Sequence, residues 1–516
     1  MGKYVVGIDV GTTGSKAMVI DLKGNIIGAG YREYKLSEPK PAWVEVGAKF
    51  LMDVTFEAVK EAVEKSGVDN REIDAISFSV NRSSFCLMDG KLDVLDDKFY
   101  VWLDGRAESV MAEINEKISP ERRNAITGMP GYNIFAVAKY YWVKKFEPET
   151  YKNTKYFSSV DSYAMHCFGS DEFVAELSNA TVTGMIDVNT LDWSKDIIEK
   201  LGFDKAKFPK LVNPGEIVGK IKADVAQKTG LAEGTLIVAG SGDQQVSAMG
   251  AGVVEDGAVS LTIGTFGLLA IGLAKPNFEA LTGMMIPLTP KVGVFQVEGP
   301  QVSGATCYRW CRDTLCADEV AEGEKTGVDP YVLMEKNYVQ KSVPGSNGVV
   351  FYSALFGSGY PTWDTNATGL FVGLRSTNTK ADMVRSVMEG ITFECRHILE
   401  SVLSAGVKMQ DIITITGGAS KSKGWCQIIA DIMGRRIRTL NVPDSAVIGA
   451  AGIAAIASGH YRNLEEVVGN MVHFGDIYEP IPANVEKYNK LFDVYKSTYY
   501  GLKSTDVFAK LAAFRG

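Results

Sequence analysis

Hydrophobic residues form short runs near the start of the chain. Residues 4–8 and 17–20 are apolar and are joined by the turn DVGTTGSK, and a third run at residues 25–31 follows another turn. Runs of this length, separated by turn residues, are typical of β-strands. The pattern therefore predicts a three-stranded β-meander.

A similar order of runs returns in the second half of the chain. The segment AVSLTIGTFGLLAIGL is predicted to form a strand, a Gly/Thr turn and a second strand, and VGVFQVEG a third strand. Two copies of one three-strand opening indicate two related domains. We place them at residues 1–245 and 246–516.

Helical spacing of apolar positions appears between these strand patterns. It covers residues 47–66 and 381–404, and the second segment is followed by a predicted strand (IITITGG) and a further helix (KSKGWCQIIADIMG). The last forty or so residues are also helical by pattern. Strands that alternate with helices favour an α/β fold.

Length and charge narrow the class of protein. A chain of 516 residues with 46% hydrophobic residues is too long for one ordinary core, so we expect two domains with a ligand cleft between them. The net charge of -8, without a long Lys/Arg run, does not suit nucleic acid or an anionic membrane. No apolar stretch reaches the roughly 18 residues of a membrane span, and no signal-peptide pattern precedes the first strand. We expect a cytoplasmic protein with a diffusible small substrate and neither a nucleic-acid nor a membrane partner.

Seven cysteines are spread thinly along the chain, and only Cys307, Cys311 and Cys316 lie close together. Their spacing lacks the CxxC pairs of a zinc site. The pattern indicates buried thiols in a reducing compartment.

The first candidate site is the turn after residues 4–8, with Asp9, Gly11, Thr12, Thr13 and Ser15. A tight turn of small hydroxyl residues lets backbone N–H groups approach phosphate oxygens, and a carboxylate beside it can hold Mg²⁺. The spacing fits neither a Walker A loop nor a GxGxxG opening. An ordinary hairpin turn is the alternative interpretation.

Three further segments carry candidate chemistry. Gly264 and Thr265 form the matching turn of the second half. Asp243 lies between a buried-strand run and a small-residue helix, where it suits a general base or, alternatively, a helix cap. Gly417 and Gly418 open a helix where a flat ligand can approach the backbone, although paired glycines are also common at turns.

The order and separation of these four segments resemble the FGGY carbohydrate kinase family, within the actin, hexokinase and heat-shock ATPase superfamily. GIDVGTTGSKAMVID and LTIGTFG look like its two phosphate motifs, and GGASKSKGWCQIIADIMG resembles its adenosine motif and signature. TGMPGYNIFAVAKYYWVKKFEP is similar to the other signature, with Lys139 and Trp142 at its core. The resemblance implies two actin-like (ribonuclease-H-like) α/β domains around a catalytic cleft, with the acceptor on the N-terminal domain and the nucleotide on the C-terminal domain.

The resemblance also implies roles for individual residues. Asp9 would organise Mg²⁺, Asp243 would be the general base, and ATP would be the phosphoryl donor. The residues implied in nucleotide binding are Gly11, Thr12, Thr13, Ser15, Gly264, Thr265, Gly304, Gly417, Gly418 and Ser422. Those implied in acceptor binding are Asn81, Arg82, Trp102, Asp104, Asp243 and Gln244.

The acceptor implied first is a ketopentose such as xylulose. Val80, Asn81 and Arg82 differ from the Gln-Met-His common in xylulokinases, and Ser83 replaces the Glu that follows Arg in glycerol kinases. A polyol such as glycerol or erythritol, or autoinducer-2, is therefore the alternative acceptor. A non-catalytic nucleotide switch is disfavoured, because a switch has no use for the base at Asp243. A homodimer is one possible assembly.

Overall fold

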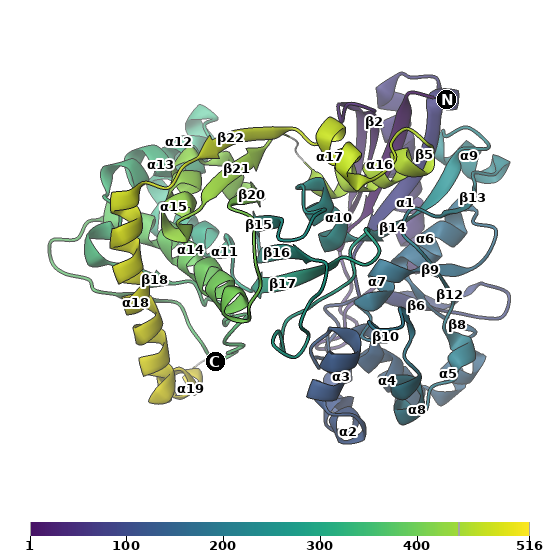
Figure 1. The fold of residues 1–516 in the computed structure, drawn as a ribbon, viewed down its shortest axis with the longest axis horizontal. Helices are drawn as coiled ribbons and strands as arrows, with labels where there is room; N and C mark the ends of the chain where they lie inside the picture. Colours follow the sequence, from purple (N-terminus) through teal and green to yellow (C-terminus); the bar gives the residue numbers. More distant parts are fainter. Residues whose placement is uncertain (1, 442–443, 515–516) are drawn as a thin grey trace. The chain divides into compact units, whose positions relative to one another are not determined.

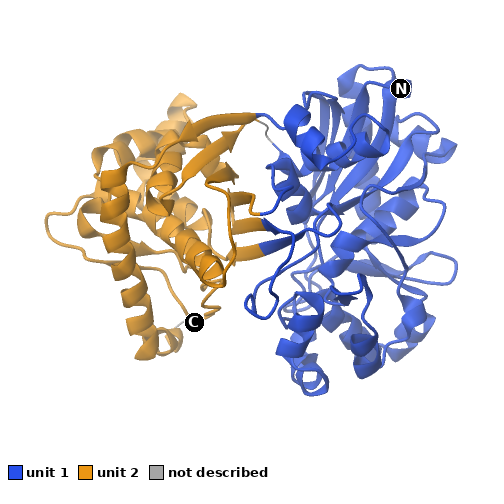
Figure 2. Ribbon diagram, viewed as in Figure 1, with its two compact units in different colours: residues 1–256, 272–297, 442–473 blue, residues 257–271, 298–441, 474–516 orange. Residues whose placement is uncertain are grey.

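The computed structural model describes residues 2–441 and 444–514. The chain divides into two compact units (Figure 2). Unit 1 contains residues 1–256, 272–297 and 442–473, and unit 2 contains residues 257–271, 298–441 and 474–516. The sequence did not anticipate the two later segments that belong to unit 1. The domain boundary that we placed at residue 245 remains a proposal.

Unit 1 is built on a six-stranded sheet that contains the predicted meander. Its strands, in sheet order, are β13 (Ile217–Lys220), β14 (Leu236–Gly242), β5 (Ile73–Val80), β1 (Tyr4–Val10), β2 (Gly14–Asp21) and β3 (Ile26–Glu33). β1, β2 and β3 pair antiparallel, whereas β5 and β14 continue the sheet in parallel. Helix α1 (Ala48–Ser66), predicted from residues 47–66, packs on β2 and β3.

A second sheet of unit 1 carries the candidate acceptor loops. Its strands, in sheet order, are β4 (Glu45–Val46), β7 (Val94–Tyr100), β6 (Phe85–Met88) and β8 (Tyr156–Ser159). Two short ribbons pair β9 (Val174–Glu176) with β12 (Lys210–Val212) and β10 (Ile186–Asp187) with β11 (Asp192–Trp193). The helices of this region are α2 (Met111–Lys117), α3 (Pro120–Thr127), α4 (Ala136–Phe146), α5 (Pro148–Asn153), α6 (Val160–Phe168), α7 (Leu177–Thr181), α8 (Lys195–Leu201) and α9 (Ala223–Thr229).

Unit 2 repeats the strand order of the first sheet. Its strands, in sheet order, are β17 (Phe295–Gln301), β16 (Gly267–Leu273), β15 (Val259–Ile263), β20 (Ile412–Thr416), β21 (Arg436–Leu440) and β22 (Phe474–Tyr478). As in unit 1, the first strand of the meander, here β15, pairs in parallel with its other neighbour, β20. At the edge opposite the meander, β22 pairs antiparallel with β21. The predicted duplication of the three-strand opening is confirmed.

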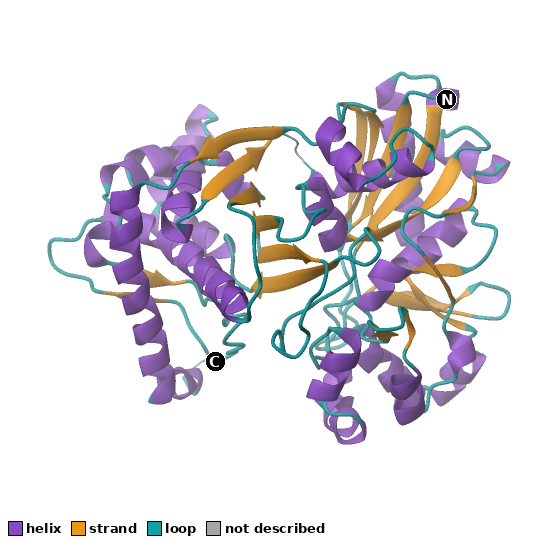
Figure 3. Cartoon of the chain, viewed as in Figure 1, coloured by secondary structure: helices purple, strands orange, loops and turns teal. Residues whose placement is uncertain are grey.

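Helices pack beside the strands in each unit (Figure 3). In unit 2, α14 (Lys380–Ser404) and α15 (Lys423–Met433) occupy the two segments predicted as helices, and α15 contacts α18 (Pro482–Ser504) near the C-terminus. The remaining elements of unit 2 are α11 (Thr306–Leu315), α12 (Ala317–Thr326), α13 (Pro330–Asn337), β18 (Val350–Tyr352), β19 (Leu370–Val372) and α19 (Val507–Ala512). The mixed α/β class with two sheet-containing units is confirmed.

Three features of the sequence can be checked on the fold. The clustered thiols of Cys307, Cys311 and Cys316 are buried, as predicted. All seven cysteines are free. Among the described residues, no helix is both long enough and apolar enough to cross a membrane.

Two small-residue helices of unit 1 pack unusually close to each other and to the sheet. These are α10 (Asp243–Gly250) and α16 (Ser445–Ala457), and Figure 1 shows α16 beside the strands of this sheet. A Cβ placed on Gly449 would lie 2.3 Å from the Val246 carbonyl oxygen, and one on Gly7 of β1 would lie 2.2 Å from the Val447 carbonyl oxygen. Backbone therefore meets backbone where larger side chains would hold these elements apart.

We predict that Gly449→Ala destabilises the protein, because the added methyl group must displace the backbone of α10. The free energy of unfolding should fall by about 1–3 kcal/mol, the usual cost of an overpacked core. Gly469→Ala on α17 (Leu464–Met471) is the matched control, since nothing lies within 4 Å of its added Cβ. This control should be neutral or more stable by up to about 1 kcal/mol, the helix preference of Ala over Gly. Denaturant unfolding measures both, and equal stability of the two variants would contradict the packing argument.

Candidate active site

The first predicted phosphate turn follows β1 in unit 1. The Gly11 N–H donates to the Gly14 carbonyl oxygen over 3.0 Å and closes the turn, with Thr13 exposed at its tip. Asp9 lies just before the turn, and the Ser79 hydroxyl donates to its Oδ1 over 2.6 Å. Asp9 is thus held on the sheet, next to a turn with free space for a ligand at Thr13.

Negative charge surrounds Asp9. Burial raises the pKa of the Asp9 carboxyl to about 7, and the charge of Asp444 acts in the same direction, with a smaller effect from Asp243. The hydrogen bond from Ser79 and the charge of Lys16 oppose this rise. A site that disfavours its own carboxylate charge is suited to a cation, because a bound cation would restore the ionised form.

Asp444 is a site residue that the sequence analysis missed. It is the N-cap of α16, where its Oδ1 accepts a hydrogen bond from the Val447 N–H over 3.2 Å, and its Oδ2 pairs with the Lys16 ammonium. The sequence nevertheless contains a pattern that could have identified Asp444. Asp444 precedes the small-residue helix SAVIGAAGIAA in the same way that Asp243 precedes QQVSAMG.

Asp243, the predicted base, is the first residue of α10. Its Oδ1 accepts a hydrogen bond from the Gln244 N–H over 2.7 Å and lies 3.3 Å from Nε of Arg82. The N-cap position belongs to Gly242, which has no side chain for capping. The Asp243 side chain is 28% exposed, so a hydroxyl group can reach it.

Arg82 follows β5 and lies beside this carboxylate. Its guanidinium contacts Asp243 through Nε and donates from Nη1 to Oε1 of Gln245 over 3.2 Å. The structure therefore brings together Arg82 and Asp243, which the sequence predicted from two distant segments. It adds Gln245, which the sequence analysis did not select.

Asn81 and Trp102 both contact the phosphate turn. The Asn81 amide donates from Nδ2 to the carbonyl oxygens of Val10 and Gly11, at 3.0 and 3.2 Å. The Trp102 indole N–H donates to Oγ1 of Thr12 over 3.0 Å. The two candidate acceptor residues are thus linked to the turn that carries Thr12.

A small cavity lies behind this turn. Gly11, Thr12, Asn81 and Ser84 line it together with apolar side chains. Oδ1 of Asn81 is buried and has no hydrogen-bond partner among the described residues. The amide is therefore fixed through its nitrogen and leaves an acceptor oxygen unused.

Two predicted site residues have side chains committed to other contacts. Ser15 is fully buried, and its hydroxyl pairs with that of Thr55 on α1 over 2.8 Å. Asp104 is 1% exposed and accepts four hydrogen bonds, one from the Val44 N–H and three from Arg106. Neither side chain has a group left for a ligand, so we leave both out of the proposed site.

Unit 2 brings its predicted glycines together around the second turn. A Cβ on Gly417 would lie 2.5 Å from the Ile263 carbonyl oxygen, and one on Gly304 would lie 2.8 Å from that of Gly264. Both glycines have positive φ angles, 80° and 40°. The backbone segments around Gly264, Gly304 and Gly417 therefore pack in direct contact, and Thr265 stays exposed beside them.

Gly418 and Ser422 differ in their availability for a ligand. Gly418 is exposed, and a Cβ placed on it would have the Ile263 carbonyl oxygen as its nearest neighbour, 4.0 Å away. The Ser422 hydroxyl donates to Glu335 over 2.7 Å and accepts from the Trp425 N–H at the start of α15. Ser422 thus fixes the start of the helix, whereas Gly418 offers open backbone.

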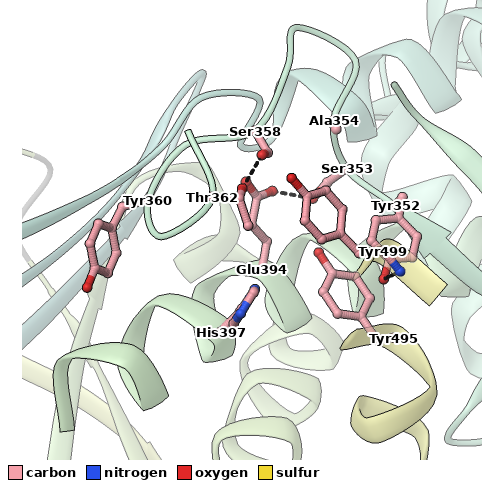
Figure 4. A pocket seen from close by; sticks show the side chains of 10 residues that line it. All are labelled: Tyr352, Ser353, Ala354, Ser358, Tyr360, Thr362, Glu394, His397, Tyr495 and Tyr499. Carbon is pink, nitrogen blue, oxygen red and sulfur yellow. Dashed lines mark hydrogen bonds between the residues drawn. The ribbon is translucent and has the colours of Figure 1, made fainter. Parts of the chain in front are cut away.

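A cavity beneath this region contains none of the predicted site residues (Figure 4). Tyrosines from β18 and α18 surround Glu394 of α14 there. Glu394 Oε2 accepts from the Gln301 side chain over 2.9 Å, and burial raises the pKa of this carboxyl. Gln301 lies three residues before Gly304, so this buried network supports the segment that carries Gly304.

No group of three or more His, Cys, Asp or Glu side chains that could hold a metal ion occurs among the described residues. Magnesium, however, is often bound by one or two carboxylates together with water and substrate phosphates. Asp9, an oxygen donor in a negatively charged setting, suits such a site.

Comparison with known proteins gives one family for both halves. The sequence matches the N-terminal domain of the FGGY family of carbohydrate kinases over residues 4–250, and the C-terminal domain of that family over residues 259–458. The xylulose kinase of Bacillus subtilis is 29% identical over 513 residues, which is 99% of each chain. Glycerol kinase 2 of Thermotoga maritima is 26% identical over 503 residues, covering 96% of this chain and 97% of that protein.

Solved structures agree with the sequence matches. The crystal structure of ligand-bound xylulose kinase from Lactobacillus acidophilus has a TM-score of 0.89 and 25% identity, and the match covers 99% of this chain and 100% of that one.

We predict a pH-dependent stabilisation by Asp9→Asn. The folded chain keeps the Asp9 proton up to a pH of about 7, whereas the unfolded chain releases it near a pH of about 4. The stability of the unsubstituted protein therefore falls as the pH rises between these values, and Asn removes that loss. In buffer with a metal chelator, Asp9→Asn should be more stable by about 1–4 kcal/mol at pH 8 and equally stable near pH 4.

Denaturant unfolding at several pH values measures this difference. Asp224→Asn, in the exposed first turn of α9, controls for the loss of one surface charge. A stability difference for Asp9→Asn that does not change with pH would contradict the raised pKa.

Proposed function

Because the chain belongs to the FGGY family of carbohydrate kinases, we propose that it transfers the γ-phosphoryl group of ATP to a hydroxyl of a ketopentose such as xylulose. The protein is a phosphotransferase with an alcohol group as acceptor, and its class of substrate is a small sugar. The proposed roles rest mainly on one observation, the ion pair between Asp243 and Arg82 near Asp9 in unit 1.

Asp243 is proposed as the general base. An alcohol must lose its proton as it attacks phosphorus, and a carboxylate within hydrogen-bond reach accepts that proton. Its place at the start of α10 puts the charge at the positive end of the helix, and Arg82 lies on its other side. These contacts hold the carboxylate in one orientation.

Arg82, Asn81, Trp102 and Gln244 are proposed to bind the acceptor. A guanidinium offers several N–H donors in fixed directions, which suits the adjacent hydroxyl and carbonyl groups of a ketose. Asn81 holds the backbone of the turn through its amide nitrogen, and Trp102 can cover the apolar C–H side of a sugar. Their links to the turn at Thr12 connect acceptor binding to phosphate binding.

Each of the two turns is proposed to contribute backbone groups to donor binding. Gly11, Thr12 and Thr13 in unit 1 and Gly264, Thr265, Gly304, Gly417 and Gly418 in unit 2 are the residues that we retain. Asp9 would hold Mg²⁺, directly or through water, and the ion would neutralise phosphate charge during transfer. Phosphoryl transfer needs positioning and charge neutralisation more than covalent chemistry, which fits a site built from turns and carboxylates.

Xylulose is preferred because the relative of highest identity named above, at 29%, is a xylulose kinase, and so is the solved structure with a TM-score of 0.89. A polyol is the second candidate, since a glycerol kinase is also similar over nearly the whole chain. Ser83 does not decide between them, because its hydroxyl donates to the Val182 carbonyl oxygen over 2.8 Å in the interior. The free thiols favour a reducing compartment, in line with the cytoplasmic location that we propose.

A coupled ADP-release screen tests the acceptor. Pentuloses, pentoses, tetritols, glycerol, gluconate and dihydroxypentanedione should be compared by kcat/KM. The highest value is expected for xylulose. A higher value for glycerol or a tetritol would establish the polyol candidate, and one for dihydroxypentanedione would establish an autoinducer-2 kinase.

Asp243→Asn should lower kcat by roughly 10² to 10⁴, because the shape of the side chain is kept while its capacity to accept a proton is lost. ATP affinity should change little. Asp224→Asn, also in the first turn of a helix, is the matched control and should keep normal kcat. Near-normal turnover of Asp243→Asn on the best acceptor would remove the base assignment.

Arg82→Ala should raise the KM for the acceptor by about 10-fold to 100-fold, the effect of losing a hydrogen bond from a charged group. The KM for ATP should stay nearly constant, since Arg82 is proposed to bind only the acceptor. Steady-state kinetics with each substrate varied in turn give both values. An unchanged acceptor KM would take Arg82 out of the acceptor site.

A further inference from the structure

The Arg82 guanidinium must be held in a fixed direction if it is to bind the acceptor and also contact Asp243. Its side chain is 12% exposed and extends from the end of β5 toward the start of α10. One partner is Asp243, itself proposed to react. Another is Gln245, the residue after Gln244. Gln245 is 1% exposed and therefore does not face the acceptor.

The Gln245 carboxamide can adopt only one orientation. Its Nε2 donates to the carbonyl oxygens of Ser178 and Leu288, at 3.0 and 3.4 Å. Its Oε1 accepts from Nη1 of Arg82. A flipped amide would place N–H groups against the guanidinium and oxygen against two carbonyl groups, so both ends would repel their neighbours.

Helix α7 fixes the two carbonyl groups that hold Gln245. Ser178 belongs to α7, and the Leu288 N–H donates to Oγ1 of Thr181 in the same helix over 3.2 Å. The start of α7 is held by the buried Glu176, which accepts the N–H groups of Ser178 and Asn179 at 2.6 and 2.8 Å. A continuous buried chain of hydrogen bonds thus leads from Glu176 to Arg82.

Gly242 provides the space for this contact. A Cβ at Gly242 would lie 2.5 Å from Oε1 of Gln245 and 2.7 Å from Cδ of Arg82. The two side chains therefore meet directly over the backbone at the end of β14.

We propose that Gln245 is a positioning residue for acceptor phosphorylation, which acts by holding the Arg82 guanidinium against Asp243 and toward the acceptor. The inference rests on the proposed function of Arg82 but not on which acceptor is used. The alternative is that Gln245 only satisfies buried carbonyl groups and stabilises the fold. The two hypotheses differ in whether the loss of activity on substituting Gln245 depends on the presence of Arg82.

A double-mutant cycle separates these possibilities. Gln245→Met keeps the length of the side chain and removes its polar groups. It should lower kcat/KM for the best acceptor by about 10-fold to 100-fold, mainly through KM, and leave the KM for ATP unchanged. In the Arg82→Ala background the same substitution should change kcat/KM by less than about twofold, because its effect is transmitted through Arg82. Equal losses in both backgrounds would overturn the proposal.

Gln245→Glu gives a second readout if the Met variant does not fold. At low pH a neutral carboxyl can donate to one carbonyl group and accept from Arg82, as the amide does. At high pH the carboxylate repels the carbonyl groups and draws Arg82 away from Asp243. The acceptor KM of this variant, divided by that of the unsubstituted enzyme, should rise with pH, and a constant ratio would count against the proposal. Gln227→Met on the exposed face of α9 is the control for the substitution itself.

Crystal structures of the unsubstituted protein and Gln245→Met keep the test independent of turnover. The guanidinium of Arg82 should leave its place beside Asp243 in the variant. If the screen finds no acceptor at all, the proposed function fails, and these structures alone decide the role of Gln245. If an acceptor is found but Arg82 stays in place in the variant, the positioning role fails and the proposed function stands.

Discussion

The close packing of α16 against both β1 and α10 is the constraint on which the site in unit 1 depends. Gly7 lets the backbones of β1 and α16 meet, and Gly449 and Gly250 do the same for α16 and α10. The hydroxyls of Ser247 and Ser445 pair over 2.7 Å at the same contact. Because α16 starts at this contact, its N-cap residue Asp444 is brought within electrostatic range of Asp9, and Asp243 at the start of α10 has a smaller effect on the same carboxyl.

This arrangement has an electrostatic consequence. Burial and the charges of Asp444 and Asp243 disfavour the ionised form of Asp9, and the Ser79 hydrogen bond and Lys16 offset only part of that effect. A cation bound beside Asp9 would favour its ionised form, so cation binding and the loss of the Asp9 proton are linked. The proposed magnesium site would in this way make use of the raised pKa of a buried acid.

The fold could be predicted from the sequence more fully than the site. Both meanders, α1, α14 and α15 have strong apolar periodicity, and the structure contains each of them. Asp9 and Asp243 lie at the ends of predicted buried strands and could be found from that pattern, whereas Arg82 was identified through the family resemblance. The sequence could not separate Ser15 and Asp104 from the site residues that we retain, because it does not show that Thr55 and Arg106 occupy their polar groups. Asp444 was missed because it lies about 200 residues from Asp243, in a segment that returns to unit 1 late in the chain.

Contact with Arg82 has two opposing effects on Asp243 as the proposed base. A guanidinium beside a carboxylate stabilises its ionised form, and so makes it a weaker proton acceptor while keeping it ready at neutral pH. Here Nε of Arg82 lies 3.3 Å from Oδ1 of Asp243, and Nη1 donates to Oε1 of Gln245. The direction of the guanidinium is therefore set by one partner that is proposed to react and by one that is not.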